Sequence, residues 1–170
     1  ESSLQLATFL THHPFIGDAV TGKNEVWPCY IHQVLKNTLH NDLVLKILKF
    51  CTEEQRVYKI NEPDNHGHTP LYYFIDSHRY DIEKYSKSEE AKQKWVGSLF
   101  ISDKSSSELL GILLKGADSD NLRSVFPLLK TNKKLCSYYL LGVLKHTEDA
   151  GLAIELLDLG ADPMQVFTDY

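Results

Sequence analysis

The chain has 170 residues, 42% of them hydrophobic and 24% charged, and a formal net charge of −5. This length fits one domain with a self-sufficient core, and the apolar runs are interrupted well before the roughly 20 residues that a membrane span needs. The negative charge and a pI near 5.9 argue against a broad nucleic-acid footprint and against anionic membrane surfaces. We therefore expect a globular monomer that binds neither nucleic acid nor membrane.

The cysteines Cys29, Cys51 and Cys136 are an odd number at wide, unpatterned spacing. A disulfide framework is therefore not expected, and the three residues predict buried thiols in a reducing compartment. The chain begins at Glu1 and shows no basic-then-apolar leader, so we interpret it as a piece of a longer protein. On these grounds we expect it in the cytoplasm.

The first part of the chain predicts short helices. Residues 4–10 have the spacing of a helix that ends near Pro14, and this helix is either a cap or the remnant of a preceding unit. Pro28 then stands at the start of a helix pair. Its apolar positions are Ile31, Val34 and Leu35 in the first helix, and Leu43, Val44, Ile47 and Leu48 in the second.

Residues 60–71 contain turn formers that lead into Thr69 and Pro70. Pro70 suits the first helical position because the amides of the first turn have no intrahelical partner, and the Thr69 hydroxyl can accept from one of them. An apolar stripe follows at Leu71, Phe74 and Ile75. The segment therefore predicts a turn and then a helix that starts at Pro70.

From Arg79 to Ser107 this pattern breaks, and a polar, charged stretch replaces it. Ser86 and Glu89 match a capping box at the start of one extra amphipathic helix. Its apolar positions are Ala91, Trp95, Val96, Leu99 and Phe100. We interpret residues 79–107 as an insertion.

Two later segments end in the same way, with the sequence KGAD at residues 115–118 and LGAD at residues 159–162. In both, leucines at helical spacing stop at a glycine, which most easily adopts the left-handed conformation after a helix C-terminus. The sequence therefore predicts that Gly116 and Gly160 end helices. Between them, Asn121 is expected to cap a short segment broken at Pro127, and a helix pair is expected over Leu135–His146 and Asp149–Leu159.

These motifs resemble the ankyrin repeat family, whose units have the pattern D-x-x-G-x-T-P-L-H and a closing L-L-x-x-G-A-D. The opening matches Asp64, Gly67, Thr69, Pro70 and Leu71, and the closing matches Ile112, Leu113, Gly116, Ala117 and Asp118, and again Leu156, Leu157, Gly160, Ala161 and Asp162. The resemblance implies an all-α fold, an α-solenoid of irregular ankyrin-like helix pairs with an inserted helix. Such ragged arrays also resemble those of secreted effectors of intracellular bacteria, which would place the protein in the host cytoplasm.

The units depart from the family pattern. Tyr72 replaces the usual histidine, Phe74 replaces a small alanine, and Gly116 and Gly160 are 44 residues apart where about 33 is usual. We therefore divide the single domain 1–170 into irregular parts. They are an N-terminal cap (1–25), a divergent repeat (26–62), a repeat with the insertion at 79–107 (63–118), a second divergent repeat (119–162) and the start of a next unit or a tail (163–170).

Repeat arrays leave a concave face made from turn tips and first helices. The resemblance implies that this face binds a protein partner through Asn65, His66 and His68 on the turn and Tyr73, Asp76 and Ser77 on the first helix. Tyr72 is expected mainly between repeats, and Trp95 mainly in the core. For the adjacent pair Tyr138 and Tyr139, packing and partner contact remain equally open.

The sequence predicts no catalytic, cofactor or metal site. Cys29 and His32 are three residues apart, but a thiol hydrolase also needs an oriented base and an oxyanion site. A hydrolase that used Cys136 as its nucleophile would likewise need a histidine within hydrogen-bond reach. His66 and His68 have no further ligand at a supporting spacing for zinc. We expect a non-catalytic interaction module, the alternative being an accessory or substrate-positioning domain of a larger enzyme.

Overall fold

The computed structural model describes residues 30–36, 41–85 and 104–164. These residues form helices joined by turns, and none of them belongs to a strand, which confirms the all-α class. The helices are α3 (Tyr30–Lys36), α4 (Asn41–Phe50), α5 (Glu53–Asn61), α6 (Pro70–Tyr85), α8 (Lys104–Gly116), α9 (Ser119–Arg123), α10 (Phe126–Leu129), α11 (Lys133–His146) and α12 (Ala150–Asp158). In this part of the chain, no helix has the length and apolar character needed to cross a membrane.

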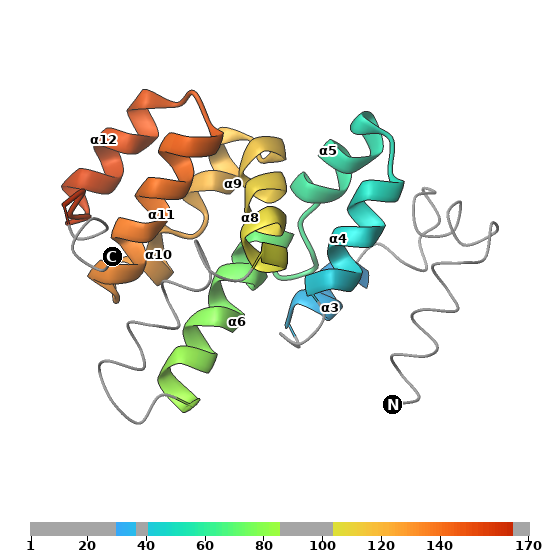
Figure 1. Cartoon of the computed structure of the whole chain (residues 1–170), viewed down its shortest axis with the longest axis horizontal. Helices are drawn as coiled ribbons and strands as arrows, with labels where there is room; N and C mark the ends of the chain where they lie inside the picture. The colour runs from blue at the N-terminus through green and yellow to red at the C-terminus, as the bar shows by residue number, and fades with distance from the viewer. Residues whose placement is uncertain (1–29, 37–40, 86–103, 165–170) are drawn as a thin grey trace.

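The helices follow one another across the molecule (Figure 1). Helices α3, α4 and α5 lie at one end, α11 and α12 lie at the other, and α8 stands between them. Helix α8 packs against α4 on one side and against α11 on the other, while α3 packs against α6. The central helices therefore carry the contacts that join the two ends.

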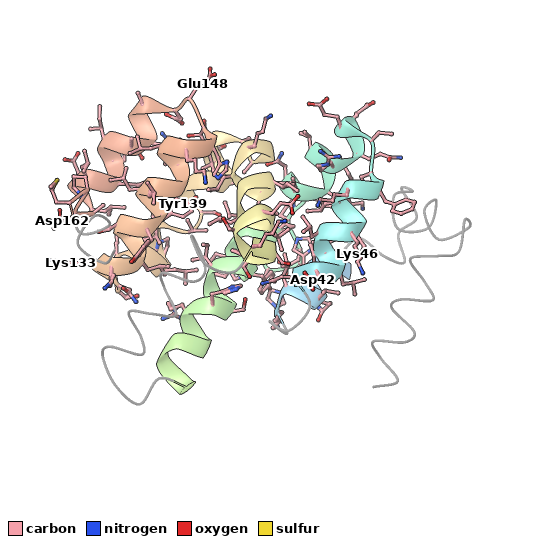
Figure 2. The ribbon with its side chains drawn as sticks, in the orientation of Figure 1. Asp42, Lys46, Lys133, Tyr139, Glu148 and Asp162 are labelled. Carbon is pink, nitrogen blue, oxygen red and sulfur yellow. The ribbon has the colours of Figure 1, made fainter. Side chains whose placement is uncertain are left out.

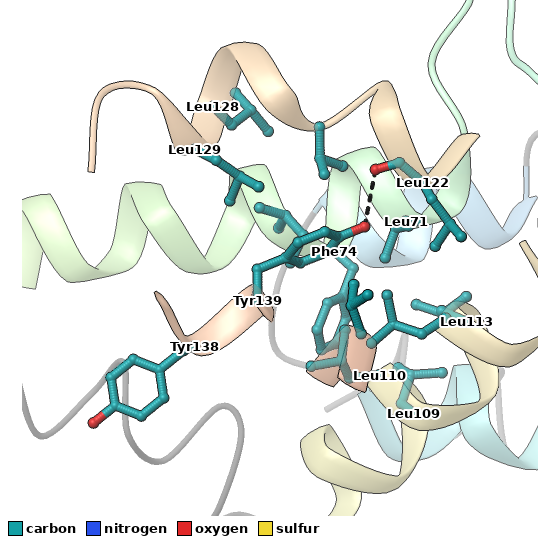
Figure 3. Close-up of a cluster of buried hydrophobic side chains, with 14 of the residues drawn as sticks. Leu71, Phe74, Leu109, Leu110, Leu113, Leu122, Leu128, Leu129, Tyr138 and Tyr139 are labelled. Atoms are coloured by element: carbon teal, nitrogen blue, oxygen red, sulfur yellow. Dashed lines mark hydrogen bonds between the residues drawn. The ribbon is translucent and has the colours of Figure 1, made fainter. Parts of the chain in front are cut away.

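Helix α11 is central to the C-terminal half. Tyr139 lies inside among the helices, whereas Lys133 begins α11 and Glu148 lies in the turn between α11 and α12 (Figure 2). Tyr138 and Tyr139 are both buried, although they are adjacent and point in different directions (Figure 3). Helix α11 packs against both α8 and α12, so more than one of its sides is covered.

The core collects apolar side chains from successive helices (Figure 3). Phe74 of α6 is fully buried, as are Leu109 and Leu113 of α8. The Tyr139 hydroxyl donates to the carbonyl of Leu122 at 3.0 Å, so the polar end of this ring is satisfied within the core. One continuous cluster of buried side chains thus includes residues from α3 to α12.

The two glycines behave differently from one another. Gly160 has φ +96°, and the Ala161 amide donates back to the Leu156 carbonyl at 3.0 Å, as expected for a helix terminator. Gly116 also ends its helix as predicted, as the last residue of α8, but it is not in the left-handed region, so only the predicted conformation is wrong. A Cβ on Gly116 would lie 2.6 Å from Ile60 Cδ1, so a side chain here would have to displace Ile60, and close packing rather than turn geometry favours glycine.

Several predicted boundaries need correction. Helix α6 starts at Pro70 as expected but continues to Tyr85, six residues beyond the predicted break at 79. The Thr69 hydroxyl is buried and has no hydrogen-bond partner among the described residues, so it does not cap the helix. Asp118, not Asn121, caps α9, by accepting the Asn121 amide at 2.9 Å.

Helix α5 is an addition to the predicted pair in residues 26–62. Thr52 and Gln55 form a capping box at its start, which the sequence reasoning did not use. At its other end, Asn61 donates to the Gly116 carbonyl at 2.8 Å and accepts the Asp118 amide at 2.9 Å. The end of α5 is therefore tied to the end of α8.

Some predicted features lie outside the described residues. They are the N-terminal cap (1–25), the Pro28 helix start with Cys29, the capping box at Ser86 and Glu89, the inserted helix with Trp95, and the end of the chain from residue 165.

Candidate functional site at the turn before α6

The turn of residues 62–68 is the region in which the sequence predicted a binding surface. The Asp64 amide donates to the His68 carbonyl at 2.9 Å, and the Gly67 amide donates to the Asp64 carbonyl at 2.9 Å. Gly67 has φ +77°, a conformation that glycine adopts without steric cost. The backbone alone therefore closes this loop tightly.

The Asp64 carboxylate holds the turn from inside. Its Oδ1 accepts the amides of His66 at 2.8 Å and His68 at 3.0 Å, and its Oδ2 accepts the Tyr73 hydroxyl at 2.6 Å. Burial by itself raises the pKa of Asp64, but these hydrogen bonds outweigh it and hold the pKa well below its usual range. Asp64 is therefore ionised and joins the turn to the first helical turn of α6.

Aromatic rings form a layer above this anchor. The His68 ring stacks on Tyr72 with centroids 3.8 Å apart and planes 8° from parallel. Tyr73 meets His68 edge-on at 5.6 Å, and His66 lies 6.3 Å beyond His68 in a nearly parallel plane. The imidazole of His68 is thus held between a fixed phenol ring and the exposed tip of the turn.

Helices α3 and α5 support the turn from below. The buried His32 ring lies edge-on to Tyr73 at 6.0 Å and donates through Nε2 to the Glu62 carbonyl at 2.9 Å. The Lys59 ammonium lies 3.0 Å from the Glu62 carboxylate in a largely buried ion pair. The turn is thus fixed to α3, α5 and α6.

The six residues predicted to contact a partner separate into three groups. Asn65 and His66 are exposed at the tip, and His68 and Asp76 are half-buried beside it. Tyr73 and Ser77 are each only 7% exposed, because they face the core side of α6. Their hydroxyls are used internally, Tyr73 on Asp64 and Ser77 on the Phe74 carbonyl, so we remove both from the surface.

Asp64 is the residue whose role the sequence reasoning missed. Its place in the D-x-x-G pattern predicts a turn, but not the hydrogen bonds to His68 four residues later and to Tyr73 nine residues later. A local signal exists for part of this role, because an aspartate side chain in a turn commonly accepts the backbone amide two residues later. Half-buried Asp76 also has a partner, the Arg79 guanidinium at 3.0 Å.

The described cysteines do not have the surroundings of a nucleophile. Cys51 and Cys136 are buried free thiols, and burial raises the pKa of each. The Cys136 thiol points to the Leu156 carbonyl at 3.7 Å rather than to a base. A reactive cysteine needs an accessible site that stabilises the thiolate. Both thiols are buried, and at Cys51 burial outweighs the nearby positive charges of Arg56 and Lys59, which by themselves lower the pKa.

The histidines of the turn have their own contacts. His66 Nδ1 lies 3.4 Å from the Asp64 carboxylate, and the His68 ring is stacked on Tyr72. Across the described ranges, no three His, Cys, Asp or Glu side chains are grouped so that they could hold a metal ion.

Comparisons with known protein families, with curated proteins and with solved structures found no match.

Proposed function

We propose that this protein is a non-catalytic interaction module that binds a protein partner through the turn of residues 62–68 and the adjoining first turns of α6. The observation that supports this proposal most directly is the carboxylate of half-buried Asp64, which accepts three hydrogen bonds beneath an exposed tip. A surface of this kind loses little conformational entropy on binding, because its backbone is already ordered.

The chemistry of this surface suits a protein partner. Asn65 and His66 offer exposed hydrogen-bonding groups, and half-buried Tyr72 and His68 offer flat ring area at low entropic cost. Asp76 adds a carboxylate one helical turn after Tyr72. Polar groups around a small aromatic centre are the arrangement found in many protein interfaces.

We further propose that the helices form a short, irregular solenoid of the ankyrin type. The proposal is supported by the helix pair α11–α12, by the left-handed Gly160 that ends it, and by the D-x-x-G turn before α6. In such an array the turn tips line one face. Cys51 and Cys136 are free thiols, which supports a location in a reducing compartment such as the cytoplasm.

The test is affinity capture from cytosolic extract with the whole chain as bait. The variant combines Asn65→Ala, His66→Ala and Asp76→Ala, all at exposed or half-buried positions, so the fold is expected to persist. The matched control combines Lys46→Ala, Lys115→Ala and Lys130→Ala at exposed positions elsewhere. Circular dichroism and urea unfolding verify that the three proteins are equally folded.

We expect a protein that the wild-type chain and the lysine control both retain and that the turn variant loses. A protein retained equally by all three baits would place recognition elsewhere and contradict the proposed surface. Capture of no protein at all would instead favour an accessory domain that acts only beside a catalytic domain of the same polypeptide.

A further inference from the structure

Helix α3 is short and depends on its neighbours. It has seven residues, Tyr30–Lys36, fewer than the roughly 12–15 that an isolated helix needs to be stable in water. It packs against α6 and, with fewer contacts, against α4. Ile31 and Leu35 supply its buried apolar side chains. A change that separates α3 from these neighbours therefore also removes the helix.

His32 is a buried polar residue of α3. Its ring is edge-on to Tyr73 of α6, and its Nε2 donates to the Glu62 carbonyl of the turn at 2.9 Å. The other ring nitrogen, Nδ1, is buried and has no hydrogen-bond partner among the described residues. The ring of the docked helix therefore carries its proton on Nε2 and holds Nδ1 where nothing can accept a second one.

The charges around His32 oppose one another. Of the described groups that act on the ring, Asp64 and Glu62 of the turn favour its protonated form, and Lys59 of α5 opposes it. Tyr73 is the titratable group that faces the ring from α6, and its hydroxyl donates to Asp64. Helix α4 also packs against α3 but contributes none of these charges. Burial outweighs the carboxylates and lowers the pKa of His32.

We propose that His32 makes the docking of α3 sensitive to acid, so that a second proton on the imidazole, at Nδ1, releases α3 from α6 and from the turn of residues 62–68. A charged ring with an unpaired N–H is costly to bury, whereas water solvates both nitrogens of an exposed ring. Because α3 is too short to remain helical alone, its release is a local unfolding of this segment.

The turn itself keeps its shape when α3 is released. Burial raises the pKa of Asp64, but its hydrogen bonds hold that pKa well below the usual range, so the carboxylate stays ionised while His32 takes up its proton. It continues to accept the amides of His66 and His68. A proton on His66 would strengthen the turn, because Nδ1 lies 3.4 Å from the same carboxylate. Acid therefore acts on α3 and not on the turn.

The consequence is a new surface beside the turn. Tyr73 is only 7% exposed, and two of the groups that lie against its ring belong to α3. They are the His32 imidazole at 6.0 Å and the Lys36 ammonium at 5.7 Å from the ring centroid. Release of α3 uncovers this side of the ring. The change needs no partner, so its test does not depend on the proposed function.

The experiment follows amide hydrogen exchange by NMR in the whole chain, with rates corrected for the intrinsic effect of pH. The Leu35 amide reports on α3, and the His66 and His68 amides report on the turn. The Leu140 amide reports on α11. Between about pH 7.5 and pH 5.5 the equilibrium constant for opening of α3 should rise several-fold, with a limit of about tenfold, because a released His32 with an ordinary pKa of about 6.5 binds a proton that the docked ring does not. The turn and α11 should stay protected.

Two variants and one direct measurement complete the test. His32→Gln can still donate to the Glu62 carbonyl but does not titrate, so the acid response of the Leu35 amide should disappear. His146→Gln is the matched control, since it removes a half-buried histidine of α11, and it should respond as the wild type does. In the wild-type chain the NMR signal of the His32 ring should titrate over the pH range in which α3 opens.

Three results would overturn the proposal. One is exchange at Leu35 that does not change with pH after the correction, and another is an equal change in the His32→Gln chain. The third is loss of protection in the turn and in α11 together with α3, because acid would then unfold the whole chain rather than release one helix.

Discussion

His32 lies under the turn of residues 62–68 and is only 2% exposed. Its Nε2 donates to the Glu62 carbonyl, while Nδ1 is buried without a hydrogen-bond partner among the described residues. Burial lowers the pKa of His32, and this effect outweighs the hydrogen bond to Glu62 and the nearby carboxylate of Asp64. The folded protein therefore favours the neutral imidazole, with the proton on Nε2.

This preference makes the folded state sensitive to acid. Because the pKa of His32 is lower in the folded chain than in the unfolded chain, its contribution to stability is complete above about pH 6.5 and is lost as pH falls towards the folded pKa. We expect the free energy of unfolding, measured by urea denaturation, to decrease below about pH 6.5.

His32→Gln provides the control, because a glutamine amide can still donate to the Glu62 carbonyl but does not titrate. The loss of stability with falling pH should be smaller in this variant. It should not vanish, since burial also lowers the pKa of His146. An unchanged pH dependence would show that His32 is not responsible.

At the scale of elements, α5 and α8 meet at Gly116, where a side chain would crowd Ile60. Ile60 is 1% exposed, and its Cδ1 occupies the position next to Gly116. The Asn61 side chain joins the same helices. It donates to the Gly116 carbonyl, and its oxygen accepts the Asp118 backbone amide and the Asn121 side-chain amide. The two helices therefore approach each other closely at this point because residue 116 has no side chain.

Gly116→Ala should destabilise the fold by about 1–2 kcal/mol, because crowding of Ile60 outweighs the gain from a better helix former. Ile60→Val removes the crowded Cδ1, so in that background Gly116→Ala should be neutral or stabilising. Urea unfolding of the wild type, both single variants and the double variant measures this coupling. Additive effects would show that Ile60 does not restrict position 116.

At the scale of the whole molecule, Phe74 lies where several helices meet. Its fully buried ring belongs to the cluster that also contains Leu113 of α8, Leu122 of α9 and Tyr139 of α11 (Figure 3). The ring fills the space between these helices. The two ends of the chain thus share one core.

Phe74→Ala should lower the free energy of unfolding by about 3–5 kcal/mol, since the ring leaves a cavity that its neighbours cannot fill. Phe50→Ala removes a phenyl ring from an exposed position and should change the free energy of unfolding by less than about 0.5 kcal/mol. Chemical denaturation followed by circular dichroism and by tyrosine fluorescence measures both. Two results would contradict a shared core. One is an unfolding transition of the Phe74→Ala chain that differs between the two probes, and the other is an equal loss of stability in Phe74→Ala and Phe50→Ala.

The sequence by itself determined the helical class and many helix positions, because apolar spacing, prolines and capping residues act within a few residues of one another. Helix starts at Pro70 and at the Asp149 cap, the left-handed Gly160 and the exposed tip at Asn65 and His66 all follow from such local rules. The separation of helix α5 was also encoded locally, in the Thr52 capping box.

Only the tertiary structure decided what each side chain faces. Tyr73 and Ser77 are buried, Tyr138 and Tyr139 are both in the core, and Gly116 serves packing rather than a turn. These outcomes depend on contacts between helices that are far apart in the sequence, such as Asn61 with Gly116. A local pattern gives the direction of a side chain around its own helix, but the neighbouring helices determine whether that direction leads to solvent or to the core.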